Sequence, residues 1–429
     1  MPTINNNNMN ERYENRVLAK EIQITTNSRI TGLNNNVLVI GGSGSGKTGG
    51  YVIPNIQNAV GSLCVCDTKN QLERHYGRML MSKGYKVMKL DLVNMEQSWS
   101  YNPLDFIKRY KDGRICEKDV LTVAATMCPL TDHSEPIWDM CARSYIAFLI
   151  AYCLEALEPK EHNLVTVAQL HRQFSQQNGD TPFLLWIDKN SDSFAAKKYF
   201  EIMANRAADK MFASVMGFVN EALEPFTYRE AEYIFIPKKK NINLHDLGNR
   251  KTALFVNTSD TDRTFDKIVD TVFSQIMQLL CRDADNTATG RLKIPVHIML
   301  DDFACSGKIP DFDKIISVTR SRDISVSLIL QSMSQLESIY DEKAAKTIIN
   351  NCDRWIYLGG QDMDTIQQIA DRAGRTPESI LCMPRDKEYL IVSGQKAVLV
   401  DKVKPYSTVM LKGTAPQSCG ADEPAGLVS

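Results

Sequence analysis

The sequence lacks several features that would assign a protein to a class at once. It has no excess of charge, because 50 lysine and arginine residues stand against 51 aspartate and glutamate residues. This balance excludes a protein that is basic overall, although it is compatible with a local basic patch. The longest apolar run, residues 145–154, is about half of the roughly 20 residues that a membrane-spanning helix needs, so no span is expected.

Export signals and metal-ligand spacings are also missing. The chain starts Met-Pro-Thr-Ile followed by four asparagines, without the charged and apolar segments of a signal peptide. Of the eleven cysteines only Cys64 and Cys66 lie close together, and no Cys or His pairs have the spacing of a zinc site. Scattered thiols without an export signal indicate reduced cysteines and a cytoplasmic location.

Short apolar runs alternate with helical stretches over much of the chain. This alternation predicts an α/β fold with a parallel-rich central sheet covered on both faces. The expected strands are residues 37–40, 62–66, 85–90, 252–257, 296–300, 325–330 and 355–358, with 22–24 as a shorter candidate.

One long segment has helical periodicity and few candidate strands. Helices are expected at 120–127, 137–157, 164–174, 193–207 and 211–223. We therefore predict an all-α domain inserted into a discontinuous α/β domain. The predicted boundaries are a flexible arm at 1–20, the discontinuous α/β domain at 21–114 and 236–412, the all-α domain at 115–235, and a disordered tail at 413–429.

The first expected strand runs directly into a glycine-rich loop. Residues 41–48 match G-x-x-x-x-G-K-[ST], in which backbone N–H groups surround phosphates, the lysine reaches the β- and γ-phosphates and the hydroxyl binds Mg²⁺. A flexible linker is the alternative, but a linker would not join a strand to a helix. The predicted ATP-binding residues are Gly41, Gly42, Ser43, Gly44, Ser45, Gly46, Lys47 and Thr48.

A second strand ends in two carboxylates, Asp301 and Asp302. A nucleotide-hydrolysing protein needs acids at such a strand end, to hold Mg²⁺ and to orient the attacking water. We predict Asp301 as the magnesium ligand, beside Thr48, and Asp302 as the catalytic acid. A strand-end turn with both carboxylates in solvent is the alternative. Asp67, which ends another strand, is a rival for either role and could line the nucleotide site.

Polar residues near the next strand complete the candidate site. Gln331 follows the strand 325–330, where a sensor of the γ-phosphate would lie, because ligands bind at the carboxyl ends of parallel strands. Arg320 and Arg322 precede that strand. Either could complete a neighbouring subunit's active site, and a surface position at a helix end is an equal alternative.

These motifs in this order resemble the type IV coupling proteins, the TraG/TraD-like ATPases of conjugative transfer. The resemblance covers roughly residues 15–406. It includes the phosphate loop, Asp67-Thr-Lys69, Leu300-Asp-Asp-Phe-Ala304, Arg320 and the segment 330–336. Further matches are Tyr101-Asn-Pro-Leu104, Ile137-Trp138, Asn351-Cys-Asp353, Ile391-Val-Ser-Gly394 and Lys402.

The resemblance implies a RecA-like motor that forms homo-hexameric rings around DNA, with an all-α domain that engages the transfer substrate. Lys47 and Thr48 then bind nucleotide, Asp301 holds Mg²⁺, Arg320 acts in trans and Gln331 is the sensor. Two departures matter. The family usually has Asp-Glu where this chain has Asp301-Asp302, and it usually begins with membrane helices that are absent here.

Two functions follow as expectations. The first is an ATP-dependent coupling protein that recruits and pumps single-stranded DNA, with its relaxase, to a type IV secretion channel at the inner face of the membrane. The second is a non-catalytic docking module for a relaxase, which the aspartate at 302 favours. A small-molecule kinase is a remote third. Candidate DNA contacts are Lys238, Lys239, Lys240, Arg206, Lys210 and Arg229.

Overall fold

The computed structural model describes residues 12–129, 137–176, 179–205, 209–259, 261–262, 264–302 and 308–404, and the side chains of 204, 205 and 209–211 are outside the description. The tail expected at 413–429, Arg206 and the side chain of Lys210 therefore lie outside the described residues.

One large sheet organises the described residues. Its nine strands lie in the order β11-β10-β9-β3-β8-β7-β4-β6-β5. All pairs from β9 to β5 are parallel, whereas β10 is antiparallel to both β9 and β11. The strands are β3 (Val37–Ile40), β4 (Ser62–Asp67), β5 (Lys86–Asp91), β6 (Thr252–Asn257), β7 (Val296–Leu300), β8 (Ile324–Leu330), β9 (Arg354–Tyr357), β10 (Lys387–Val392) and β11 (Val398–Asp401).

Side chains of the central strands alternate between two apolar layers. In β3, Val37 and Val39 join the layer beneath α3 and α4, while Leu38 and Ile40 join the opposite layer with α13 to α17. A sheet covered on both faces explains why its strands are continuous apolar runs in the sequence. The covering helices are α3 (Ile53–Gln57), α4 (Leu72–Ser82), α12 (Asp246–Asn249), α13 (Asp266–Asp285), α14 (Phe312–Val318), α15 (Met333–Ile339), α16 (Glu342–Asn350), α17 (Met363–Ala373) and α18 (Pro377–Leu381).

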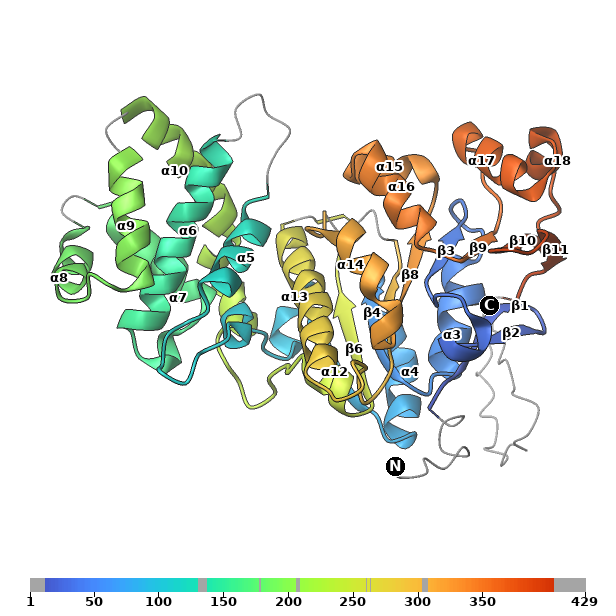
Figure 1. Ribbon diagram of the computed structural model, residues 1–429, viewed down its shortest axis with the longest axis horizontal. Helices are drawn as coiled ribbons and strands as arrows, with labels where there is room; N and C mark the ends of the chain where they lie inside the picture. Colours follow the sequence, from blue (N-terminus) through green and yellow to red (C-terminus); the bar gives the residue numbers. More distant parts are fainter. Residues whose placement is uncertain are drawn as a thin grey trace, which may run out of the picture.

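The segment between β5 and β6 is helical, as the periodicity predicts. Figure 1 shows its helices gathered at one end of the molecule, beyond the sheet. They are α5 (Glu117–Met127), α6 (Ile137–Ala156), α7 (Leu164–Phe174), α8 (Thr181–Lys189), α9 (Phe194–Asn205), α10 (Asp209–Leu223) and α11 (Glu232–Phe235). Of these helices, α8 and α11 were not predicted from the sequence.

Helix α6 is the centre of this helical region. Within the described residues it is the one helix that is long and apolar enough to cross a membrane by length and composition, but 67% of its most apolar window is buried. Its aromatic side chains, Tyr145 and Phe148, contact Phe174 of α7 with ring centroids 5.4 and 5.8 Å apart. The apolar run is thus explained by packing inside the protein.

The prediction of a flexible arm over residues 1–20 is wrong for the part that the structure describes. Residues 15–19 form β1 (Asn15–Ala19), whose last four residues are buried, and β1 pairs with β2 (Ile22–Thr25) in a separate antiparallel sheet. The helix α2 (Ser28–Thr31) follows and leads into β3.

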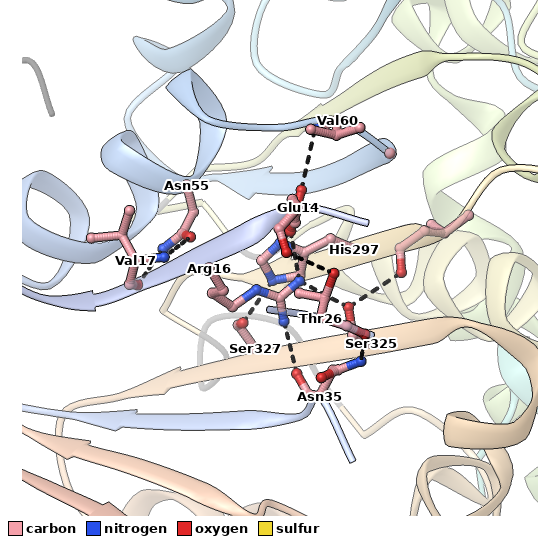
Figure 2. A network of polar contacts seen from close by, with 12 residues as sticks. Glu14, Arg16, Val17, Thr26, Asn35, Asn55, Val60, His297, Ser325 and Ser327 are labelled. Atoms are coloured by element: carbon pink, nitrogen blue, oxygen red, sulfur yellow. Dashed lines mark hydrogen bonds and ion pairs between the residues drawn. The ribbon is translucent and has the colours of Figure 1, made fainter. Parts of the chain in front are cut away.

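A polar network holds β1 against the main sheet (Figure 2). The Asn55 side chain of α3 accepts a hydrogen bond from the backbone N–H of Val17 at 3.0 Å and donates to its carbonyl at 2.9 Å. The buried Arg16 guanidinium donates to the Glu14 carboxylate at 2.9 Å and to the Ser325 hydroxyl at 3.1 Å. Buried charges of this kind need such partners. The N-terminal strand is therefore part of the fold.

Candidate nucleotide-binding site

The glycine-rich loop lies where the sequence predicts, between β3 and the π-helical turn η1 (Thr48–Val52). Gly44 and Gly46 have φ of +72° and +97°, which side chains disfavour. A side chain on Gly41 would collide with Ser45 Oγ and would lie 2.8 Å from Leu358 Cβ. These positions therefore require glycine, which supports a loop of exposed backbone N–H groups and argues against a linker.

The Lys47 side chain folds back onto this loop. Its Nζ donates to the carbonyl oxygens of Gly41 and Gly42 at 2.5 and 3.0 Å. Burial lowers the pKa of Lys47, and the nearby carboxylates of Asp301 and Asp302 oppose that shift. The ammonium thus sits within the loop and close to the acids at the end of β7.

Thr48 and Asp301 are in direct contact, although 253 positions separate them in the sequence. Thr48 Oγ1 donates to Asp301 Oδ2 at 2.6 Å. Burial raises the pKa of Asp301, and the neighbouring charge of Asp302 adds to the rise, while the Thr48 hydrogen bond and Lys47 oppose it. The structure therefore brings together the hydroxyl and the carboxylate that the sequence assigns to a magnesium ion.

Asp302 and Gln331 meet across the ends of β7 and β8. Gln331 Nε2 donates to Asp302 Oδ1 at 3.4 Å. Asp302 has a φ of +53°, a left-handed conformation that aspartate and asparagine adopt more readily than most residues do. The aspartate found here is therefore a residue type that suits this backbone conformation.

A cavity of about 830 Å³ joins these groups. It is lined by residues 43–49 of the loop and by Asp67, Asp301, Asp302 and Gln331. It extends over α4, where His75 and Tyr76 also line it. The sequence analysis missed these two side chains, because an aromatic pair on a helix carries no nucleotide-binding signal by itself.

Asp67 is in the cavity wall, but its carboxylate is already engaged. Oδ1 accepts from the backbone N–H of Lys69 at 3.1 Å, and Oδ2 accepts from that of Leu72 at 2.7 Å. Burial raises the pKa of Asp67, and these backbone hydrogen bonds oppose the rise. These hydrogen bonds favour a role for Asp67 in fixing the start of α4 and in lining the nucleotide cavity. They argue against Asp67 in the roles predicted for Asp301 and Asp302.

The chain after β11 supports the loop from the other side. Lys402 Nζ donates to the carbonyl oxygens of Leu358 at 2.7 Å and Ser45 at 3.3 Å. The loop is also bound to the end of β9, because the N–H of Gly42 donates to the carbonyl of Gly359 at 2.8 Å. The Lys402 side chain thus contacts the phosphate loop through the backbone carbonyl of Ser45.

The two candidate arginines lie away from this cavity. Arg320 and Arg322 are in the turn η8 (Arg320–Arg322), before β8, whereas Gln331 follows the other end of that strand. Arg322 donates to the Asp285 carboxylate at 2.9 and 3.1 Å, so it is occupied in an ion pair. Arg320 is exposed and does not line the chain's own nucleotide cavity.

The candidate DNA contacts that the structure describes lie in the lysine run 238–240 and at Arg229. Lys238 Nζ lies 5.2 Å from the centre of the Tyr233 ring, and its backbone N–H donates to Ser100 Oγ at 2.9 Å. The backbone carbonyl of Lys240 accepts from the N–H of Ser100 at 2.9 Å. The lysine run therefore includes a turn that pairs with Ser100, and Arg229 is exposed in a separate turn, η6 (Arg229–Ala231).

The cavity's chemistry fits ATP and Mg²⁺. Ser45 Oγ is buried in its wall and has no hydrogen-bond partner within the described residues. No group of three His, Cys, Asp or Glu residues in the described chain could hold a metal alone. Magnesium is usually held by one or two carboxylates together with phosphate oxygens and water. Thr48 and Asp301 would supply the protein's share of those ligands.

Known proteins resemble this chain in sequence. The family model described as type IV secretory system conjugative DNA transfer matches residues 4–377. Protein VirD4 of Rhizobium rhizogenes is 21% identical over 428 residues, which cover 91% of this chain and 61% of VirD4. Conjugal transfer protein TraG of Rhizobium radiobacter is 22% identical, covering 79% of this chain and 52% of TraG. The chain thus spans about three fifths of the length of the VirD4 relatives.

Solved structures show the same fold at low sequence identity. Plasmid coupling protein TrwB in complex with ADP and Mg²⁺ superposes with a TM-score of 0.66 at 14% identity, covering 94% of this chain and 93% of TrwB. VirB4 of Thermoanaerobacter pseudethanolicus gives 0.56 at 10% identity, covering 92% and 97%. The family match over most of the chain leads to one conclusion: the chain belongs to the type IV secretory system conjugative DNA transfer family, the type IV coupling proteins.

Proposed function

We propose that the chain is an ATP-driven coupling protein that delivers single-stranded DNA, with its bound relaxase, to a type IV secretion channel. The carrying observation is the cavity in which the phosphate loop meets Asp301, Asp302 and Gln331, in a chain of this family. That TrwB has been solved with ADP and Mg²⁺ supports the same ligands here.

The proposed chemistry follows from the contacts of these side chains. Lys47 would exchange the carbonyls of Gly41 and Gly42 for the β- and γ-phosphate oxygens. Asp302 Oδ2 would accept a proton from the attacking water, while Gln331 Nε2 holds Oδ1. Mg²⁺, when bound through Thr48 and Asp301, would neutralise charge on the phosphates.

The assembly we propose is a homo-hexamer in which Arg320 serves the neighbouring subunit. Its place beyond the far end of β8 supports this, since the chain's own cavity lies at the other end. Partners would be the relaxase, single-stranded DNA and secretion components at the inner face of the membrane. The helical region from α5 to α10 would engage the transfer substrate.

One observation favours a second function. Asp302, one methylene shorter than the usual glutamate, occupies a left-handed backbone conformation that disfavours glutamate. A chain that binds ATP but hydrolyses it too slowly to drive transport would act as a docking module. In that case the nucleotide would set the conformation in which the relaxase is bound.

Steady-state ATPase activity distinguishes the two functions. The purified chain is assayed with and without single-stranded DNA at low and moderate salt, and its mass in solution is measured in parallel. Turnover that DNA stimulates, together with a hexamer, supports the motor. ATP binding without turnover, in a monomer, supports the docking module. Lys47→Ala is the control, because a variant that hydrolyses ATP at the wild-type rate would disprove the site.

A further inference from the structure

A second, basic cavity lies at the other end of β8 from the phosphate loop. Three arginines line it, Arg29 of α2, Arg291 and Arg320, together with serine residues and one glycine. The serine and glycine positions are Ser28, Gly32, Ser317 and Ser321. Guanidinium groups gathered around hydroxyl groups are a typical arrangement for binding phosphate oxygens.

The positive charge of this cavity is only partly compensated. Arg291 and Arg12 both pair with the Asp323 carboxylate, Arg12 at a distance of 2.7 Å. Among the described residues, no carboxylate forms an ion pair with Arg29 or Arg320, and both are exposed. Two like charges that share one cavity repel each other, and a bound anion removes that repulsion. The cavity is therefore suited to a ligand with at least one negative charge.

The chain's own nucleotide cannot be that ligand. Arg320 precedes β8, and Gln331, which lines the nucleotide cavity, follows it. A strand of seven residues is about 20 Å long at roughly 3.3 Å per residue. The anion must consequently come from another molecule.

We propose that the basic cavity receives the terminal phosphate of ATP bound to a neighbouring copy of the chain, and that Arg29 acts there as a second trans arginine beside Arg320. This inference rests on the proposed function, because it requires an assembly that hydrolyses ATP. The ion pair with Asp323 orients Arg291 at the cavity wall, while Arg29 and Arg320 supply uncompensated charge to the phosphate.

A terminal phosphate fits the observations better than a DNA backbone does. Proteins that follow a single strand place cations along a groove and interleave aromatic side chains for stacking. Here the arginines come from three separate segments and line one cavity, and no aromatic residue lines it. Such an arrangement matches one tetrahedral group with several charged oxygens.

Arg29→Gln tests the proposal. The Arg29 side chain is exposed and forms no ion pair within the described residues, so the variant should fold and bind ATP as the wild type does. We expect its hydrolysis rate to fall about 100-fold, as when one transition-state donor is removed. Arg375→Gln, which removes an exposed arginine that follows α17 and lines neither cavity, is the matched control and should keep the wild-type rate.

Mixed assemblies show from which subunit Arg29 acts. Mixed one to one with Lys47→Ala, Arg29→Gln should recover about one quarter of the wild-type rate, because half of the subunits keep Lys47 and half of their neighbours keep Arg29. Mixed with Arg320→Ala, it should recover nothing, because every neighbour then lacks one arginine. If activity recovers in the mixture with Arg320→Ala but not in the mixture with Lys47→Ala, Arg29 acts in its own subunit's site and the proposal is wrong.

The remaining outcomes separate this proposal from the proposed function. Wild-type turnover that DNA stimulates, together with an unaffected Arg29→Gln variant, would overturn the second arginine and leave the motor standing. A wild-type chain that never hydrolyses ATP, or never associates, would overturn both. Arg29→Gln could instead weaken DNA binding and lower the slope of log DNA affinity against log salt concentration by about one, with basal hydrolysis unchanged. That result would show that the cavity binds a DNA phosphate and that the proposal is wrong.

Discussion

Replacing Asn55 by alanine tests whether the N-terminal strand is part of the fold. Asn55 is 2% exposed and lies in α3, the helix that follows the phosphate loop. Its side chain accepts from the N–H of Val17 and donates to the carbonyls of Val17 and Tyr51, at 3.0, 2.9 and 2.8 Å. Alanine removes all three contacts without introducing bulk.

The expected loss follows from these three hydrogen bonds. Each contributes about 1 kcal/mol to stability, so their loss should cost about 3 kcal/mol. In the variant, the buried N–H and carbonyl of Val17 lose their side-chain partner. Because unpaired buried groups are costly, the loss in the free energy of unfolding should not be smaller than this sum. If residues 1–20 were a flexible arm instead, the two contacts with Val17 would be absent, and the change would remove only the bond to the Tyr51 carbonyl, at a cost of about 1 kcal/mol.

The assay is urea unfolding followed by circular dichroism, for the wild type and the variant. Asn58→Ala is the matched control, since Asn58 ends the same helix and its side-chain nitrogen has no hydrogen-bond partner in the described structure. That control should lose less than about 0.5 kcal/mol, as most substitutions away from specific contacts do. A loss for Asn55→Ala of about 1 kcal/mol or less, which the bond to the Tyr51 carbonyl alone accounts for, would refute the docked strand.

Three further predictions concern the site and its support. Asp302→Asn keeps the side-chain shape and suits the backbone φ of +53°. The affinity for ATP should therefore stay the same, while the rate of hydrolysis falls about 100-fold. An unchanged steady-state rate would show that another residue is the base. Lys402→Met removes an ammonium that contacts the carbonyl of Ser45 in the loop and the carbonyl of Leu358 after β9, so the KM for ATP should rise about tenfold with less change in kcat. Lys402→Arg should restore part of the affinity, and an unaltered KM in Lys402→Met contradicts this role. Burial raises the pKa of Glu388 from 4.5 to about 8, so the folded chain keeps a proton that the unfolded chain releases, and stability falls as pH rises across that window. Glu388→Gln should lose less stability between pH 5 and 8, and parallel thermal-unfolding profiles would count against the assignment.

The strands that the sequence predicts best are those whose signal is local. Residues 37–40, 252–257 and 296–300 are apolar runs buried on both faces, and their observed bounds match the predicted ones. The strands β1 and β10 were missed because each contains a charged residue that the fold buries, Arg16 and Glu388. The burial of Arg16 depends on partners from distant segments, which no local pattern reveals.

The same distinction applies to the site. The phosphate loop, Asp301, Asp302 and Gln331 could be placed together from the sequence because each follows a strand, and the carboxyl ends of parallel strands meet at one edge. Arg29 could not, because an arginine in a short polar segment is ordinarily a surface residue. Whether Arg29 is free to bind a ligand depends on which of the nearby carboxylates already form ion pairs with other residues. Asp285 pairs with Arg322, and Asp323 pairs with Arg12 and Arg291. Of the three arginines that line the basic cavity, Arg29 and Arg320 therefore have no carboxylate partner among the described residues, and this is the basis for proposing that they bind a phosphate of another molecule.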